Sequence, residues 1–420
     1  MAVINNILDR LLGLQGSDFT VTDVKVKDDE IVYRVEHSEN PVYICPRCGA
    51  KLDSAHELKW IRLKDVPMGP KRQVWEVKRA RVLCTCSNSP IVEEMPFRSR
   101  HHRLTQRFKD YIEEVLCSKM FTVADVARLF DLDYGVVYKI DHEVLLRLWQ
   151  QMEIPDPINI SVDEKSFKKG HNYVTIVTDM DTKQVIWVSE GNRKESLDQF
   201  FQVIGGDRCA KIKTVSKDLH KPYSLSCQEY VPQALEVADR FHVEKRLNEA
   251  MDDCRKELAV ESNLKSKTRK AINKARWVLR YKQENLKAHQ LEKLEELKLV
   301  NEPLYEAYLH KEAFAELFNY KPHELEDALE FLIQWIVEAF KIELQGFRKF
   351  AEYVKNHTSK LLHIVETGRS SAVSEGINRK ITVIKSMAYG YRNTQYFMLK
   401  IMQRCGVLGS LWAPESRATT

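Results

Sequence analysis

Residues 158–163 read INISVD, a short apolar run that predicts a β-strand ending at Asp163. Two later runs repeat this arrangement: IKTVSKD ends at Asp218, and ALEVADRFH contains a strand that ends at Asp239. Between the first two, HNYVTIVTDM and KQVIWVSEG flank a turn at 179–182 and predict a hairpin, and SLDQFFQVI predicts a helix. Strands that alternate with helices favour a mixed α/β sheet, in which functional groups gather beyond the strand ends.

A different composition follows this region. Residues 243–355 are rich in Lys, Glu, Leu and Ala, have very little Gly or Pro, and predict successive amphipathic helices. We expect the aromatic side chains of this segment to be core residues rather than base-stacking groups. They are Trp277, Tyr281, Tyr305, Tyr308, Phe314 and Trp335.

The segment 40–100 is short, β-rich and punctuated by Pro and Gly, with one cysteine pair near each end. Two thiolates two residues apart can hold one zinc ion, and a tetrahedral thiolate site adds folding energy to a module with a poor core. The pairs are Cys45 with Cys48 and Cys84 with Cys86. The second pair has a single intervening residue, so His56, His101 or His102 are alternatives for one ligand. Buried reduced cysteines are the structural alternative.

The stretch 121–140 has the form of a helix-turn-helix. Thr122 can cap a first helix, the segment 131–133 makes the turn, and Val136, Val137 and Ile140 lie on one side of a second helix. The basic segment RSRHHRLTQRFK comes just before it. Many helical hairpins share this pattern without binding DNA, but the basic segment favours DNA.

Composition restricts the class of protein. At 420 residues and 44% hydrophobic, the chain is long enough for two or more folded domains, and no charge-free apolar stretch approaches the ~18 residues of a membrane span. Nine cysteines without a secretion signal predict reduced thiols and the cytoplasm. The net charge is only +5, but basic residues are grouped, as in a run that fits either phosphate contact or a solvated helix face. The run contains Lys265, Lys267, Arg269, Lys270, Lys274, Arg276 and Arg280.

Carboxylates from distant parts of the chain suit phosphoryl transfer with two metal ions. Mg²⁺ takes oxygen ligands, and Asp163 and Asp218 at strand ends with Glu375 near a helix start would supply them. Any single aspartate at a strand end can instead cap a helix or polarise a turn. Glu164 is a weaker candidate than Asp163, because adjacent strand residues point to opposite faces.

Several motifs together resemble one family. They are the module with Cys45 and Cys48, the segments 161–164 and 169–173, the segment 216–219 with Pro222 and Tyr223, the segment 239–243, and the segment 374–381 leading to 388–393. In these motifs the chain resembles the ISL3 family of bacterial insertion-sequence transposases over nearly its whole length. The resemblance implies an RNase H-like core with a DDE carboxylate trio.

The same resemblance implies roles for single residues. Asp163 matches the first catalytic aspartate, Asp218 the second and Glu375 the glutamate, all as ligands of Mg²⁺ or Mn²⁺. Asp239 and His242 match the Asp-x-x-His signature that follows the second aspartate, which makes Asp239 the main competitor of Asp218 for the second place.

Helix residues around Glu375 are candidates for DNA contact, because they put hydrogen-bond donors and positive charge beside a carboxylate. They are Asn378, Arg379, Lys380 and Lys385. An ordinary basic surface helix would explain the charges alone. By resemblance, the N-terminal modules recognise the element's terminal inverted repeats, and the partners are double-stranded DNA at the element ends and target.

We therefore expect a multidomain α+β protein: a zinc-binding β module, a helix-turn-helix, and an RNase H-like mixed α/β core interrupted by an all-α insertion. The boundaries are 1–100 for the zinc module, 101–152 for the helix-turn-helix, 153–242 and 356–420 for the core, and 243–355 for the insertion. Since two ends must be joined, a homodimer or larger assembly on DNA in the bacterial nucleoid is expected.

Two other functions are weighed against a DNA transposase. A recombinase that links covalently to DNA through Ser or Tyr would need a hydroxyl nucleophile, and the sequence has no matching cluster. A transposase-derived, zinc-bearing DNA-binding regulator would lack catalysis, and retention of all three carboxylates argues against it.

Overall fold

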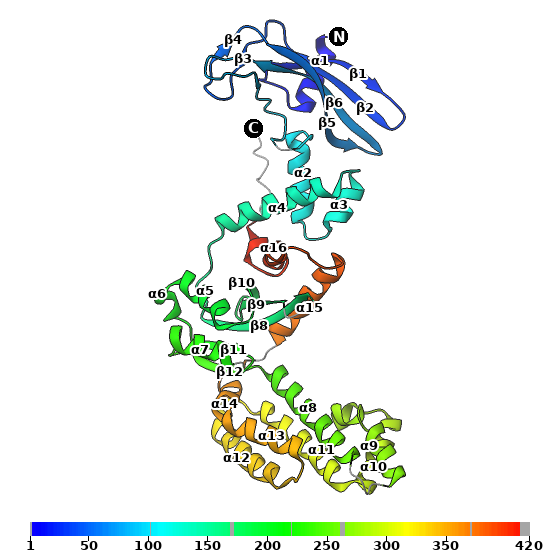
Figure 1. Cartoon of the computed structure of the whole chain (residues 1–420), viewed down its shortest axis with the longest axis vertical. Coiled ribbons are helices and arrows are strands. Elements are labelled where there is room, and N and C mark those ends of the chain that lie inside the picture. Colours follow the sequence, from blue (N-terminus) through cyan, green and yellow to red (C-terminus); the bar gives the residue numbers. More distant parts are fainter. Residues whose placement is uncertain are drawn as a thin grey trace. The chain divides into compact units, whose positions relative to one another are not determined.

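A computed structural model describes residues 2–100, 102–168, 172–219, 221–260, 265–369 and 372–411 (Figure 1). One compact unit ends at Gln151, and a second runs from Met152 to Ser410. Helices and sheets occur together, as expected of a multidomain α+β protein. No helix within these described ranges is long and apolar enough to span a membrane.

The first unit begins with a helix and a twisted sheet. Strand order is β1-β2-β6-β5, with β7 paired to β6, and β3 and β4 form a separate small ribbon. The elements are α1 (Ala2–Leu12), β1 (Phe19–Val26), β2 (Glu30–His37), β3 (Tyr43–Ile44), β4 (Lys51–Leu52), β5 (Glu57–Met68), β6 (Lys71–Val82) and β7 (Ile91–Val92).

This sheet corrects the prediction of a poor core. Strands β1 and β2 lie before residue 40 and join β5 and β6 around the fully buried Trp75. Val21, Val35 and Val77 are buried in the same cluster. Residues 40–100 alone lack the apolar side chains that α1, β1 and β2 contribute to this core.

Three helices complete the first unit: α2 (Gln106–Cys117), α3 (Val123–Leu129) and α4 (Tyr134–Gln151). Thr122 caps α3 and forms a reciprocal capping box with Asp125, as its sequence predicted. Asp131, with φ 50°, turns the chain into α4. Val126, Val137 and Ile140 are buried between the helices, which fixes the angle of the pair.

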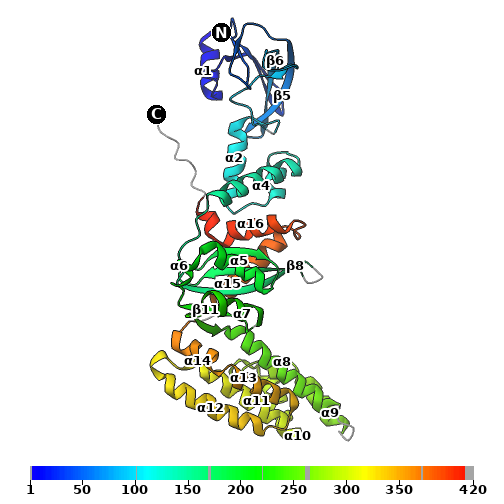
Figure 2. The same cartoon turned by 60° about the vertical axis from the view of Figure 1, so that its left-hand side comes forward.

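A five-stranded mixed sheet forms the centre of the second unit, with strand order β10-β9-β8-β11-β12 (Figure 2). The strands are β8 (Asn159–Lys168), β9 (Asn172–Asp179), β10 (Gln184–Glu190), β11 (Thr214–Lys217) and β12 (Leu235–Ala238). The predicted hairpin is confirmed by the antiparallel pairing of β9 with β10. β8 is parallel to β11, which is parallel to β12.

The prediction that the first strand ends at Asp163 is wrong. β8 continues to Lys168, because β9 pairs with it along this whole stretch. Its parallel neighbour β11 ends at Lys217, level with Val162. Asp163 therefore lies where the parallel part of the sheet stops, although its own strand goes on.

Helices cover both faces of this sheet. On one face, α5 (Lys194–Ile204), α6 (Gly206–Cys209) and α7 (Lys221–Tyr230) bury Phe200 and Phe201 against Ile160 and Val162. On the other face, α15 (Ala372–Met387) joins β8 through a hydrogen bond between the Ser374 and Ser161 hydroxyls. Phe397 of α16 (Thr394–Cys405) stacks on Phe167 of β8, and a short helical turn, η5 (Val407–Ser410), follows.

Between β12 and α15 the chain forms a helical region with its own core. It contains α8 (Arg240–Ala259), α9 (Ser266–Lys274), η1 (Val278–Arg280), η2 (Gln283–Asn285), α10 (Ala288–Val300), α11 (Glu302–Phe314), η3 (Ala315–Asn319), η4 (Pro322–Glu324), α12 (Leu325–Lys341), α13 (Gln345–Asn356) and α14 (Thr358–Thr367). α14 packs against β12 (Figure 1).

The aromatic residues of this region divide into two groups. Tyr308, Phe314 and Trp335 are buried and Tyr305 packs against the same core, as predicted. The prediction is wrong for Trp277 and Tyr281, which are 57% and 49% exposed. Val278 and Leu279 fill the core at this turn instead.

Candidate active site

Three aspartates follow the same level of three adjacent parallel strands. Lys217 of β11 pairs with Val162 of β8 on one side and with Ala238 of β12 on the other. The next residue on each strand path is an aspartate: Asp163, Asp218 and Asp239. Neighbouring strands lie about 4.8 Å apart, so the sheet register gathers three carboxyl groups in one row.

Because side chains alternate along a strand, Asp163 and its neighbour Glu164 point to opposite faces of the sheet. Ile160 and Val162 point toward the helices α5 and α7, so Ser161 and Asp163 point to the opposite face, toward α15. Glu164 turns back toward the first face, where its carboxylate accepts a hydrogen bond from Asn192. The structure thus separates Asp163 from Glu164 as strand geometry predicts.

His242 lies between two of these aspartates. Its Nδ1 is 3.3 Å from Asp218 Oδ2, and its Nε2 is 3.9 Å from Asp163 Oδ1. His242 lies in the first turn of α8. Asp239 caps this helix, because its carboxylate accepts a hydrogen bond from the Phe241 N–H at 2.8 Å. Asp163, Asp239 and His242 bring ligand atoms within 4.8 Å of one another; among the described residues, Asp218 lies outside that group.

Glu375 comes to this place from the first turn of α15, as predicted. It borders a hollow of about 500 Å³ that Asp163 and Asp239 also line, while Asp218 is not part of the lining. The other lining residues are Lys165, Phe241, Ser374, Asn378, Arg379, Thr382 and Val383. The side chain of Glu375 is about half exposed and pairs with Arg379 at 2.6 Å. A substrate group entering the hollow meets carboxylates on two sides.

The electrostatics of Asp163 reflect its burial. Burial raises the pKa of this carboxyl above its ordinary value, and the nearby Asp239 acts in the same direction. The Glu164 N–H, His242 and the amide of Asn378 act against that rise. Asn378 Nδ2 donates to Asp163 Oδ2, so this amide holds the carboxylate in place.

One carboxylate oxygen in the row lacks a hydrogen-bond donor. Asp218 Oδ1 is buried and has no hydrogen-bond partner among the described residues; the Arg246 guanidinium approaches it only to 4.0 Å. A buried anionic oxygen without a donor is costly unless a cation compensates it. The donor set of oxygens at this end of the sheet therefore fits a hard divalent ion.

The remaining predicted residues of α15 differ in their contacts. Lys385 donates to the Ser166 carbonyl at 3.4 Å, and Lys380 is exposed. Asn378 and Arg379 contact carboxylates of the site itself. Of the quoted segment 169–173, residues 169–171 lie outside the described residues.

A buried charge network behind the row had no part in the sequence interpretation. Lys217 is fully buried, and its ammonium contacts Glu236 at 2.8 Å and Ser224 at 2.6 Å. Lys360 of α14 reaches the same Glu236 oxygen at 2.8 Å. These contacts tie α14 to the two strands that precede Asp218 and Asp239. A lysine within the apolar run IKTVSKD was the available signal.

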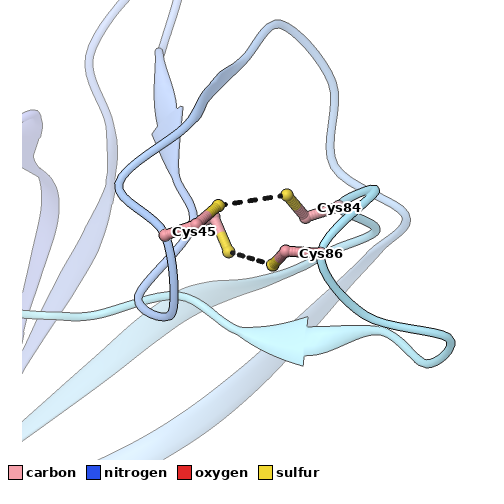
Figure 3. Close-up of side chains that lie close together, drawn as sticks. Cys45, Cys84 and Cys86 are labelled. Carbon is pink, nitrogen blue, oxygen red and sulfur yellow. Dashed lines mark hydrogen bonds between the residues drawn. The ribbon is translucent and has the colours of Figure 1, made fainter.

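The four predicted cysteines form a second cluster, in the first unit (Figure 3). Cys45 Sγ is 3.6 Å from Cys86 Sγ, and Cys48 Sγ is 3.5 Å from Cys84 Sγ. A disulfide would require about 2.05 Å, whereas four sulfurs at about 2.3 Å from one zinc ion stand roughly 3.8 Å apart. Backbone N–H groups of Arg47 and Cys48 lower the pKa of the Cys45 thiol to about 6, which favours the thiolate.

The alternative histidine ligands have different positions. His56 and His102 are not in the cluster that the described residues form, and His102 Nε2 lies 3.7 Å from Glu143 instead. His101 is outside the described residues. Because β6 carries Cys84 and Cys86 out of the sheet together, a one-residue gap suffices to bring both thiols to the other pair.

Comparison with known proteins shows the family of this chain. The ISL3-type family model, described as a transposase, matches residues 160–401. A protein of Bordetella parapertussis named as the transposase for insertion sequence element IS1001 is 31% identical over 388 residues, covering 88% of this chain and 94% of its own. The transposase for insertion sequence element IS1557 of Mycobacterium tuberculosis is 26% identical over 412 residues, covering 89% and 90%.

Proposed function

This chain belongs to the ISL3 family of insertion-sequence transposases, and we propose that it cleaves DNA at the element's ends and joins those ends to a target through a carboxylate site on an RNase H-like core. The observation that carries the proposal is the row of Asp163, Asp218 and Asp239 at one level of the sheet, with Glu375 bordering the same hollow as Asp163 and Asp239. No covalent intermediate with the protein is needed.

We assign the metal to Asp163, Asp218 and Glu375. Asp163 and Asp218 are neighbours in the parallel register, and Asp218 Oδ1 is the buried oxygen without a hydrogen-bond partner among the described residues. Asp239 lines the hollow but already caps α8, which gives its carboxylate a structural task. His242 lies between Asp163 and Asp218, nearer to Asp218.

When bound, a pair of Mg²⁺ or Mn²⁺ ions supplies Lewis-acid activation of the attacking oxygen and stabilisation of the leaving oxygen. The residues of the chain do the rest: Asn378 holds Asp163, and the exposed Lys380 and Arg379 bind phosphates flanking the scissile bond. Water is the nucleophile for cleavage, and a 3′ hydroxyl is the nucleophile for strand transfer. Both reactions are in-line attacks at phosphorus.

The N-terminal unit supplies DNA recognition in this proposal. The four thiolates hold Zn²⁺ and brace the loops around β3 and β4, and α3 and α4 act as a helix-turn-helix that reads the terminal inverted repeats. The five-stranded sheet with α15 and α16 forms the catalytic core, and the helical region from α8 to α14 is its insertion. Joining two ends requires at least a dimer on DNA.

The test is cleavage and joining of a DNA fragment that carries the element's ends, with Mg²⁺ or Mn²⁺. The unmodified protein is compared with Asp163→Asn, Asp218→Asn, Asp239→Asn and Glu375→Gln, and end binding is measured in parallel. Glu164→Gln is the matched control, since Glu164 neighbours Asp163 but faces away.

We expect the Asp163, Asp218 and Glu375 variants to lose cleavage while they keep end binding. A greater loss at Asp239 than at Asp218 would transfer the second metal position to Asp239. Full activity in all four variants would refute the carboxylate mechanism. An inactive but tightly binding unmodified protein would instead identify a DNA-binding regulator.

A further inference from the structure

In one stretch of the helical region every charged residue is basic, and an exposed aromatic residue lies among them. Residues 265–283 contain eight basic side chains and no acidic one. The basic residues are Lys265, Lys267, Arg269, Lys270, Lys274, Arg276, Arg280 and Lys282. Trp277 stands among them with 57% of its surface exposed, although large aromatic side chains are normally buried.

An exposed helix needs polar side chains to stay soluble, but they need not all carry the same charge. The helix α10 likewise buries only two of its residues, but it mixes two lysines with three glutamates. In α9 only Ala271 and Ile272 are buried, and the lysines of that helix project to solvent. Like charges that stand close together repel one another, so a surface that groups them is expected to meet an anionic partner. Lys282, at the end of the stretch, lies 4.0 Å from Glu284.

Two guanidinium groups frame the indole. The Arg276 and Arg280 guanidinium carbons lie 5.2 Å and 5.1 Å from the Trp277 ring centroid. Cation–π attraction holds these charges beside the ring, so they are prearranged for a ligand that combines a flat ring with phosphates. Tyr281, 49% exposed, follows on the same turn.

We propose that Trp277 stacks on an unpaired base of DNA while α9 and the two flanking arginines bind the phosphates of that strand. Stacked duplex DNA offers no free base face, so the aromatic group selects single-stranded or locally opened DNA. The lysines contribute affinity without sequence preference. The assignment rests on the proposed function, since strand cleavage and joining produce unpaired ends, and it adds a second DNA-binding surface outside the carboxylate site.

The experiment measures fluorescence anisotropy with the full-length protein and two labelled probes, a single-stranded oligothymidylate and a duplex of equal length. The variants are Trp277→Ala, Trp277→Phe and the triple change Lys267→Ala, Lys270→Ala, Lys274→Ala. The controls are Leu299→Ala, another exposed apolar residue of the region, and the triple change Lys293→Ala, Lys321→Ala, Lys349→Ala, which removes three exposed lysines elsewhere in it.

For Trp277→Ala we expect about a tenfold loss of affinity for the single strand, little change for the duplex, and recovery in Trp277→Phe. The α9 lysine variant should lose affinity for both probes, with the salt slope for the single strand reduced by about 2. Equal losses in the control variants, or no change in Trp277→Ala, would overturn the proposal.

The outcome is separate from that of the carboxylate test. Asp163→Asn is expected to bind the oligothymidylate as the unmodified protein does, so this surface can fail while cleavage stands. Conversely, if the unmodified protein does not cleave DNA but Trp277→Ala lowers its affinity for the single strand tenfold, the DNA-binding surface stands and the catalytic proposal fails.

Discussion

The thiol cluster and the carboxylate row are both suited to metal, but the chain builds them in opposite ways. Cys45 and Cys86 are 41 residues apart and reach each other from the loop of the β3–β4 ribbon and the loop that follows β6. Asp163 and the Asn378 that holds it are 215 residues apart, with a complete helical region between them. The first site lies within one small module, and the second exists only after distant segments have packed.

This difference predicts different consequences of damage. Thiolates that close loops are part of the fold, so their loss removes structure. The carboxylates lie on a sheet that folds without them, so their loss should abolish the reaction and leave the structure unchanged. The buried network of Lys217, Glu236 and Lys360 lies between these cases, because it supports the sheet end that carries Asp218.

The largest effect is expected at the thiol cluster. Cys48→Ser removes one of the four thiols that we propose as zinc ligands, and zinc affinity should fall more than about a thousandfold. The loops at 43–52 and 83–90 should become sensitive to protease while the sheet around Trp75 persists. Zinc content and limited proteolysis measure this. Arg47→Ala, an exposed change in the same loop, should keep its zinc, and an equal loss there would contradict a specific thiolate site.

The next effect is expected at Glu236, where Gln would leave Lys217 buried without its counterion. Breaking such a pair should lower the free energy of unfolding by about 3 kcal/mol and slow cleavage as well. Thermal unfolding and cleavage rate measure the two consequences. The control is Glu229→Gln, which removes the exposed partner of Lys194 and should change little. Similar stability in both variants would contradict a supporting role for the network.

The same residue predicts a pH dependence. Burial opposes ionisation of Glu236, but Lys217 and Lys360 outweigh it and hold its pKa below the ordinary value of 4.5. A depressed pKa means that this stabilisation is complete above about pH 4.5 and is lost as the pH falls through the folded-state value. The stability of the unmodified protein should therefore drop more steeply below pH 4.5 than that of Glu236→Gln. Parallel curves would refute the linkage.

The smallest effect is expected at Asn378. The substitution Asn378→Ala would remove the amide that holds the Asp163 carboxylate. A hydrogen bond that orients a metal ligand is worth about 10- to 100-fold in rate. Single-turnover cleavage at saturating DNA should fall about tenfold while the melting temperature changes little. Ser386→Ala, at an exposed position about two turns further along α15, serves as the matched control. Equal rates in the two variants would show that Asp163 needs no such support.

Local patterns in the sequence predicted local structure well. The hairpin of β9 and β10, the Thr122 cap of α3 and the position of Glu375 in the first turn of α15 are all confirmed. Each depends on residues within one or two turns or strands. The cysteine spacing likewise predicted a cluster of four sulfurs, and the structure brings all four together.

What the sequence did not predict depends on partners far along the chain. The length of β8 is set by β9, the core of the first sheet by strands β1 and β2, and the exposure of Trp277 by Val278 and Leu279, which fill the core instead. The choice between Asp218 and Asp239 could not be decided from spacing, because both follow a β-strand by one residue. In the structure the two differ in their surroundings: Asp218 lies on the strand next to β8, whereas Asp239 caps α8 and lines the hollow with Asp163.

The most direct test of the account is calorimetric titration of Mn²⁺ into the zinc-loaded protein, comparing the unmodified chain, Asp163→Asn and Glu164→Gln. If the carboxylates hold the reaction's metal, Asp163→Asn should weaken Mn²⁺ binding by more than about tenfold, while Glu164→Gln binds normally and zinc content is unchanged in all three. Equal Mn²⁺ affinity in Asp163→Asn and the unmodified chain would contradict the account.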